Sequence, residues 1–326
     1  MRRIRLIPSH SISHIFIIIF FCHFVSLKSQ NLKFNHLLVE DGLSQSTVFS
    51  IHKDQMGFMW FGTRRGLNRY DGNEFTYFMH DVKDSNSLCS NVIYFVIGDR
   101  KDNLIIQTDS HLNYYNRYDE TFSVIPTNES FWNLIKDREN NIWACSKSGI
   151  YTFNSQDITF DTVENGYPFT DLYDLSLDKN NNLWLTSPHG IISYTPADRK
   201  NRIYKLFDFT ESEKESMFIE TDTDSKVWIC MRNGQLMYYS EEADSFVIYR
   251  YNGHEMNLLV RSFEKGLDNT IIIGTDGNGI VQIDTKTNEH RKFNHLPDEK
   301  SSLSCNTIYS IYADNKMGLL WLGSYM

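Results

Sequence analysis

An aspartate that precedes a tryptophan by six residues occurs four times along the chain, and this spacing constrains the fold more than any other feature. The four segments are DQMGFMWFGT (54–63), DRENNIWACS (137–146), DKNNNLWLTS (178–187) and DTDSKVWICM (222–231). Two weaker copies (99–108 and 265–275) have isoleucine in place of tryptophan, and a last copy (314–324) has one extra residue. The tryptophan-equivalent positions recur every forty-odd residues, at Trp60, Ile105, Trp143, Trp184, Trp228, Ile272 and Trp321. A repeat of this length is typical of β-propeller blades.

Each repeat contains the signals of four short strands. An apolar run such as TVFSI (47–51) precedes the aspartate and suits a strand that is buried on both faces. The Asp/Asn/Gly cluster predicts a hairpin turn, the tryptophan segment a second strand, and a glycine-led segment such as GIYTFNS (149–155) a third. A more polar outer strand, for example EFTYFMH (74–80), completes the unit.

These signals predict an all-β fold, a seven-bladed β-propeller with six complete blades and an incomplete seventh. The propeller domain is expected to span 30–326, with repeats near 43–87, 88–130, 131–171, 172–214, 215–257 and 258–302 and a partial one at 303–326. The first strands should line the central channel, at 47–52, 92–97, 131–136, 172–177, 216–221, 259–264 and 307–312.

The pentapeptide KFNHL occurs twice, at 33–37 and at 292–296. The second copy is the outer strand of the sixth repeat, so the first copy is also expected to be an outer strand, although no inner strands precede it. We predict that residues 32–38 pair beside the strand that contains Trp321 and close the ring, with a gap where a third strand is missing.

The first 29 residues have the order of a secretory signal. Three arginines precede the apolar stretch HIFIIIFFCHFV (14–25), which is shorter than the roughly 20 residues of a membrane-spanning helix. We therefore predict a signal peptide in 1–29, a periplasmic location and no later membrane span. The net charge of −9, without a basic run beyond the signal, argues against a nucleic-acid partner.

The four cysteines beyond the signal fall in separate repeats and are predicted to be free thiols: Cys89, Cys145, Cys230 and Cys305. Cys145 and Cys230 occupy the same repeat position as Gly62, Gly274 and Gly323, where a small residue is required. A buried, unreactive thiol is the expected structure there.

Residues 54–72, DQMGFMWFGTRRGLNRYDG, resemble the two-component regulator propeller repeat, whose pattern is roughly D-x-x-G-x-[IL]-W-[IL]-G-T-x-x-G-[IL]-x-x-[YF]. The matching residues are Asp54, Gly57, Trp60, Gly62, Thr63, Gly66, Leu67 and Tyr70. The segment FNHLLVEDGLSQSTVFSI (34–51) is similar to the start of the exported sensor region in hybrid two-component systems of Bacteroidetes-type bacteria. The resemblance implies a periplasmic sensor that binds glycan-derived oligosaccharides and signals to a cytoplasmic histidine kinase.

The chain lacks other parts that this resemblance implies. It has no second propeller, immunoglobulin-like connecting domain, kinase or DNA-binding domain. We therefore expect a truncated, N-terminal piece of such a sensor, whose partner in full-length, inner-membrane-anchored members is the remainder of the sensor kinase. Because the seventh blade is unfinished, we expect weak glycan binding by this piece alone.

Motifs for catalysis and for cofactor binding are missing from the sequence. The phosphate-binding loop, the zinc-protease motif, the nucleophile elbow and the dinucleotide fingerprint do not occur. The Asp-rich strings at 178–182 and 222–224 lack the glycine and glutamate of a calcium loop, so hairpin turns are predicted instead. We predict a non-enzymatic sensor without cofactor, metal or catalytic residues. The alternatives are a propeller glycosidase or lyase, a protein-interaction scaffold and a non-functional fragment.

The candidate ligand-binding residues lie mostly in the turns between second and third strands, which gather around one mouth of the channel. They are Arg64, Arg65, Asp109, His111, Lys147, His189, Arg232 and Asp276. Trp132 and Tyr167, which depart from the repeat pattern nearby, complete the set. Such a mouth could hold a sugar or an anionic glycan by hydrogen bonds and stacking; the alternative is an ordinary solvated rim.

Overall fold

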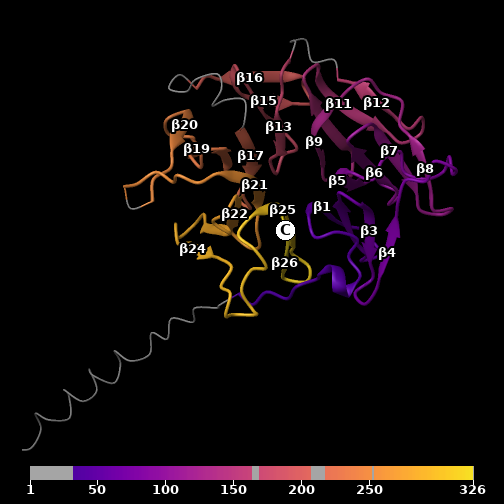
Figure 1. Ribbon diagram of the computed structural model, residues 1–326. Helices are drawn as coiled ribbons and strands as arrows, with labels where there is room; N and C mark the ends of the chain where they lie inside the picture. The colour runs from indigo at the N-terminus through magenta and orange to yellow at the C-terminus, as the bar shows by residue number, and fades with distance from the viewer. Residues whose placement is uncertain (1–31, 164–168, 207–216, 252, 326) are drawn as a thin grey trace, which may run out of the picture. The chain divides into compact units, whose positions relative to one another are not determined.

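The computed structural model describes residues 32–163, 169–206, 217–251 and 253–325. Two units are distinguished, one up to Phe34 and one from Asn35 onward, and the fold is that of the second. Its described residues form strands and one three-residue 3-10 turn, η1 (Val39–Asp41). The strands form sheets arranged around a common centre (Figure 1), so the predicted all-β propeller is confirmed.

Six of the seven sheets have four antiparallel strands in chain order. The first, innermost strands are β1 (Val48–Lys53), β5 (Ile93–Gly98), β9 (Phe131–Lys136), β13 (Asp174–Leu177), β17 (Met217–Thr221) and β21 (Val260–Lys265). The second strands are β2 (Met59–Thr63), β6 (Leu104–Thr108), β10 (Ile142–Ser146), β14 (Leu183–Ser187), β18 (Val227–Met231) and β22 (Thr270–Thr275). The third strands are β3 (Gly66–Tyr70), β7 (Leu112–Asn116), β11 (Gly149–Asn154), β15 (Gly190–Thr195), β19 (Leu236–Ser240) and β23 (Ile280–Asp284).

The fourth strands lie at the outside and are β4 (Phe75–Phe78), β8 (Thr121–Val124), β12 (Thr159–Thr162), β16 (Lys200–Tyr204), β20 (Ser245–Ile248) and β24 (His290–Phe293). The seventh sheet has two strands, β25 (Ile308–Asp314) and β26 (Leu319–Ser324). Hydrophobic clusters lie between neighbouring sheets: Ile97 and Ile105 of the second sheet, for example, pack with Leu134 and Ile142 of the third. Apolar side chains of neighbouring blades therefore pack against one another.

The aspartate–tryptophan spacing has a direct structural cause. Asp222 accepts a hydrogen bond from the indole N–H of Trp228 at 3.0 Å through Oδ2, and one from the backbone N–H of Lys226 at 2.9 Å through Oδ1. In the four regular repeats, the aspartate thus accepts a backbone N–H bond within its own hairpin and a second bond from a tryptophan side chain. The same indole bond joins Asp54 to Trp60 at 2.9 Å, Asp137 to Trp143 at 3.0 Å and Asp178 to Trp184 at 3.4 Å.

The irregular repeats depart from this arrangement in an informative way. In the second sheet, where isoleucine replaces tryptophan, the hydroxyl of Tyr114 donates to Asp99 at 2.8 Å instead. In the seventh sheet the extra residue breaks the spacing, and the buried indole nitrogen of Trp321 has no hydrogen-bond partner among the described residues. Asp314 instead pairs with Lys53 of β1 at 2.5 Å.

The hairpin prediction for the Asp-rich strings is therefore confirmed. The Asp178 carboxylate accepts backbone N–H bonds from Asn180 and Asn182, and Asp222 does the same for its own turn. Among the residues that the structure describes, no group of three His, Cys, Asp or Glu side chains is placed to hold a metal ion.

The small-residue position of the second strand lies against the first strand of the next blade. A Cβ atom on Gly323 would come within 2.5 Å of the Val48 carbonyl oxygen, and one on Gly62 within 2.8 Å of Ile93. Cys145 and Cys230 fill the same position and are fully buried. These two cysteines, and the less buried Cys89 and Cys305, are free thiols. The prediction of free cysteines is confirmed, and burial raises the pKa of the Cys145 and Cys230 thiols, which keeps them unreactive.

The two-stranded seventh sheet lies between the first and the sixth sheets. β25 contacts both β1 and β21, and the Ser310 hydroxyl donates to the Val48 carbonyl oxygen at 3.1 Å. The predicted strand at 32–38 is not confirmed: these residues form no strand, although His36 lies 2.8 Å from the Ser302 carbonyl oxygen. In the other six sheets the fourth strand pairs with the third strand. The described residues of the seventh sheet include no third strand with which residues 32–38 could pair.

Some sequence predictions lie outside the described residues, namely the signal peptide in 1–29 and the site residue Tyr167. Within the described part of the chain, no helix has the length and apolar character needed to cross a membrane.

Candidate ligand-binding site

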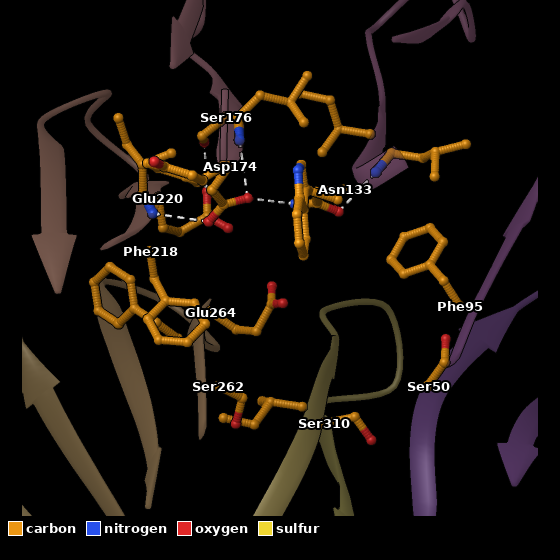
Figure 2. A pocket seen from close by; sticks show the side chains of 18 of the residues that line it. Ser50, Phe95, Asn133, Asp174, Ser176, Phe218, Glu220, Ser262, Glu264 and Ser310 are labelled. Atoms are coloured by element: carbon orange, nitrogen blue, oxygen red, sulfur yellow. Dashed lines mark hydrogen bonds between the residues drawn. The ribbon is translucent and has the colours of Figure 1, made fainter. Parts of the chain in front are cut away.

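A cavity of about 1280 Å³ lies at the centre of the ring of sheets. Residues from the first strands of all seven sheets line it, as the sequence predicts, so the cavity is the propeller channel (Figure 2). Pockets for small molecules usually have volumes of about 300–1,000 Å³. The channel therefore has room for a ligand of several rings.

Five first strands carry one extra residue where they pair with the second strand. In β1, Val48 pairs with Thr63 and Ser50 with Gly62, so Phe49 has no opposite residue. Such a bulge turns the extra side chain away from the regular pleat. We call the five bulged residues the collar: Phe49, Tyr94, Trp132, Arg261 and Tyr309.

The aromatic rings of the collar form a partly continuous surface. The Phe49 ring lies 5.5 Å from those of Tyr94 and Tyr309, measured between centroids. Tyr94 and Trp132 remain 47% and 55% exposed. Large aromatic side chains with this much exposed surface are available to stack on a ligand.

Cationic groups lie beside these rings. The guanidinium of Arg64 sits 5.4 Å from the centroid of Phe49, and that of Arg261 sits 5.5 Å from Tyr309. Arg261 also pairs with Asp276 at 2.5 Å, and this pairing holds the pKa of the Asp276 carboxyl below its usual value. The collar thus joins the turns between second and third strands at one mouth of the channel.

The predicted site residues divide into three groups. Trp132, Lys147, His189 and Arg232 line the cavity. Arg64 and Asp276 contact the collar residues Phe49 and Arg261. Arg65, Asp109 and His111 are exposed and do not line the cavity, and Tyr167 lies outside the described residues.

Three carboxyl groups line the channel wall on neighbouring strands (Figure 2). Asp174 of β13 accepts hydrogen bonds from the side-chain amide of Asn133 at 2.6 Å and the backbone N–H of Ile219 at 2.9 Å. Glu220 of β17 accepts one from the Ser176 hydroxyl at 2.9 Å. Glu264 of β21 makes no hydrogen bond or ion pair with any described residue, and Figure 2 shows it pointing into the open cavity.

Burial raises the pKa of all three carboxyl groups. The pKa of Asp174 rises to about 7, even though its hydrogen bonds act in the opposite direction. Burial raises the pKa of Glu264 well above its usual range, and the nearby Glu220 and Asp174 add to this effect. Burial raises that of Glu220 as well. Neighbouring carboxyl groups cannot all ionise cheaply in a low-dielectric wall, so the cluster retains protons near neutral pH.

Basic groups line the same wall. Lys136 of β9 faces the cavity, and burial lowers the pKa of its amine. Burial, together with Lys136, lowers the pKa of His52 in β1 to about 3, so this imidazole stays neutral. Lys265 donates to the Asp222 carbonyl oxygen at 3.2 Å. Acidic side chains of the wall therefore lie on β13, β17 and β21, and basic ones on β1, β9 and β21.

Most collar residues and all three carboxyl groups were not among the predicted site residues. The collar has a recognisable sequence pattern: an aromatic residue stands five positions before the hairpin aspartate in several repeats, as Phe49, Trp132 and Tyr309 do. The carboxyl groups could also have been noticed, since a charged residue within an otherwise apolar strand, such as Glu220 in MFIET (217–221), is unusual in a core.

Comparison with known proteins finds matches to short parts of the sequence. Residues 42–65 match the model of the two component regulator propeller family. A histidine kinase P4 of Formosa agariphila is 44% identical over 66 residues, which is 20% of this chain and 5% of that protein. The matching segment is therefore a small part of a much longer relative.

Solved structures share the fold over most of the chain. The extracellular domain of a hybrid two component system of B. thetaiotaomicron has a TM-score of 0.72 at 22% identity, covering 90% of this chain and 41% of that one. A one component system domain of the same organism gives 0.68 at 21%, covering 90% and 42%. PorZ, a surface component of the type-IX secretion system of Porphyromonas gingivalis, gives 0.60 at 16%, covering 89% and 47%.

The chain spans less than half the length of each of these proteins. The resemblance seen in the sequence is confirmed: residues 42–65 match the regulator propeller family, and the chain is a β-propeller whose fold is similar to extracellular domains of two-component systems of B. thetaiotaomicron.

Proposed function

We propose that this chain is the ligand-sensing propeller of an extracytoplasmic two-component receptor, and that its ligand is a glycan-derived oligosaccharide. The observation that carries the proposal is the collar, in which exposed aromatic rings and guanidinium groups surround the mouth of a large channel. Aromatic faces stack on the apolar faces of sugar rings, and Arg and Lys donate hydrogen bonds to hydroxyl or acidic groups.

In this proposal the collar and the neighbouring turns bind, while the sheets only hold them in place. Trp132 provides the most exposed collar ring, and Lys147, His189 and Arg232 line the channel nearby. The remainder of a sensor kinase would be the partner that receives the signal. The similarity to extracellular domains supports a periplasmic location, with residues 1–29 removed as a signal peptide; N-terminal sequencing of exported protein tests this point.

Tryptophan fluorescence and calorimetry with a panel of neutral and acidic oligosaccharides test the ligand class. Trp132 is 55% exposed, whereas the other tryptophans are buried or partly buried, so Trp132 should dominate any change in quenching by acrylamide. We expect weak binding that protects Trp132 from the quencher. Trp132→Ala should remove both the binding heat and the protection, whereas Tyr118→Ala should change neither, because Tyr118 is 84% exposed and does not line the cavity.

Binding that survives Trp132→Ala, or binding that Tyr118→Ala weakens equally, would place the ligand elsewhere. Absence of binding across the panel would reject the oligosaccharide proposal.

We also propose that β25 and β26 are the inner half of a seventh blade. β25 lines the channel like the other first strands and contacts both of its neighbours in the ring, which supports seven positions rather than six.

A glycan-active enzyme remains the second candidate because acidic groups line the channel. Glycosidases use two carboxyl groups, one of which is protonated at neutral pH. Asp174 has a suitable pKa, but its two oxygens are already bonded to Asn133 and Ile219. Chromatography of the same oligosaccharides after long incubation distinguishes the two functions, since shortened products would identify an enzyme.

A further inference from the structure

We propose that Asp174, Glu220 and Glu264 form a binding site for a protonated amine inside the channel, so that the protein selects a ligand carrying a positively charged amino group. This inference rests on the proposed function only in taking the channel as the ligand site. It adds a chemical requirement that the collar does not impose.

Glu264 is the observation that points to a ligand. The Glu264 side chain is partly buried in the channel wall and keeps some of its surface open to the cavity. It receives no hydrogen bond from any described residue and points into the open space (Figure 2). Buried polar groups in folded proteins nearly always have a partner, and an enclosed carboxyl without one is costly. A bound donor would supply what the fold leaves out.

The surroundings of Glu264 favour an ammonium group over other donors. Asp174 and Glu220, on the two strands that precede β21 in the ring, place two further carboxyl groups on the same wall, and a cation beside them would favour their ionised form. Phe218 of β17, the strand next to β21, also lines the cavity. An ammonium group gains from both a carboxylate and the face of an aromatic ring. The described carboxyl groups are not placed to hold a metal ion, which separates this site from a cation centre of the calcium type.

The hydrogen bonds of the three carboxyl groups assign them different tasks. Asn133 and Ile219 fix Asp174, and Ser176 fixes Glu220. These two groups can set the local potential without moving, while Glu264 is free to contact the ligand. Each fixed group takes its bonds from protein atoms on neighbouring strands, so a cationic ligand meets a preformed wall.

A positive ligand should also displace protons from the site. The groups that face the cluster are Lys136 on β9, His52 on β1, Lys265 on β21 and Tyr312 on β25. His52 is neutral throughout the range from pH 5 to 8, so it does not oppose the effect there. Since the carboxyl groups hold protons in the empty channel, affinity for an amine that stays protonated, such as spermidine, should rise as the pH is raised through this range.

Calorimetry with matched oligomers tests the proposal. Glucosamine trimer and N-acetylglucosamine trimer differ mainly in charge, and spermidine supplies amines without a sugar. We expect the glucosamine trimer to bind about tenfold or more tightly than its acetylated counterpart. Glu264→Gln should abolish that preference, and exposed Glu241→Gln, outside the cavity, should leave it intact. Titrations in two buffers of different ionisation enthalpy measure the protons released.

The outcomes separate this inference from the oligosaccharide proposal. Glu264-dependent binding of spermidine but of no sugar would support the amine site and reject the oligosaccharide ligand. Equal binding of the two trimers, unaffected by Glu264→Gln, would overturn the amine site and leave the oligosaccharide ligand standing. If wild-type protein that unfolds in a single cooperative thermal transition binds neither amine, the amine site is also overturned.

Discussion

The hydrogen bond between a hairpin aspartate and a core tryptophan is the smallest unit from which this fold is built. Asp222 accepts a hydrogen bond from the fully buried Trp228, so neither the carboxylate oxygen nor the indole N–H is buried without a partner. The bond requires the six-residue spacing, because the hairpin brings the two positions together. Where the spacing changes, at Asp314 and Trp321, the indole nitrogen has no partner among the described residues.

A pair of matched substitutions measures this bond. Trp228→Phe removes the indole N–H and leaves one Asp222 oxygen unsatisfied, whereas Trp321→Phe removes an N–H that makes no bond to a described residue. We expect Trp228→Phe to lower the free energy of unfolding by about 1–3 kcal/mol more than Trp321→Phe does. Urea unfolding followed by far-UV circular dichroism gives both values. Equal losses would mean that the indole bond contributes nothing beyond packing.

Residue-scale patterns were the part of the sequence that predicted most. The repeated spacing, the hairpin aspartates and the small-residue position all recur, so each copy supports the others. The carboxyl cluster recurs only in part: Glu220 and Glu264 share one repeat position, where other repeats carry His52 or Tyr312, and Asp174 stands at another, where the second repeat carries Phe95. Their proximity depends on how three blades pack, which no single repeat encodes.

At the scale of elements, second strands approach the next blade so closely that backbone atoms set the limit. A Cβ atom on Gly323 of β26 would lie 2.5 Å from the Val48 carbonyl oxygen of β1 and 2.1 Å from the Ser310 hydroxyl. The contact with the Val48 carbonyl oxygen is to backbone, which could be relieved only by a shift of a whole strand. This position therefore controls how the seventh sheet meets the first.

Gly323→Ala should weaken that junction. We expect it to lower the free energy of unfolding by about 1–3 kcal/mol, because an overpacked core position forces strands apart. Gly318→Asn, in the hairpin of the same sheet, is the control: Gly318 has a φ of 65°, a Cβ added there would meet no atom within 4 Å, and asparagine tolerates this conformation. Thermal unfolding measures both, and a Gly323→Ala variant as stable as the control would show that the junction relaxes freely.

Element boundaries could be predicted, but the pairing of the elements could not be predicted fully. The first strands were located because apolar runs precede each aspartate. The bulges at Phe49, Tyr94 and Trp132 were missed because a bulge is a property of two strands in register, not of one sequence. The strand expected at 32–38 was not confirmed, because sequence similarity to 292–296 cannot supply the third strand that an outer strand needs.

For the molecule as a whole, the channel wall links stability to pH. The folded protein keeps the Asp174 proton up to a pKa of about 7, whereas the unfolded chain releases it near 4. Folding is therefore favoured as the pH falls toward that range, and Glu220 and Glu264 act in the same direction. His52 acts in the opposite direction, but only below its unperturbed pKa near 6.5, where the unfolded chain binds a proton that the folded protein excludes.

This arrangement predicts greater stability at pH 6.5 than at pH 8. Asp174 alone should raise the free energy of unfolding by about 1 kcal/mol between these values. Asp174→Asn should reduce the difference by that amount, and comparison of the two proteins cancels the contribution of Lys136, whose pKa burial lowers. Urea midpoints at the two pH values decide it; a wild-type protein that is more stable at pH 8 would contradict a protonated Asp174.

The bulges have a consequence for how new binding properties can arise. Phe49, Tyr94, Trp132, Arg261 and Tyr309 have no opposite residue in their ladders, so changing them leaves every strand pairing in place. Mutation can therefore alter what the mouth recognises at little cost to folding, and selection can act on one property without the other. A library randomised at these five positions should remain mostly folded while its members differ widely in the ligands they prefer.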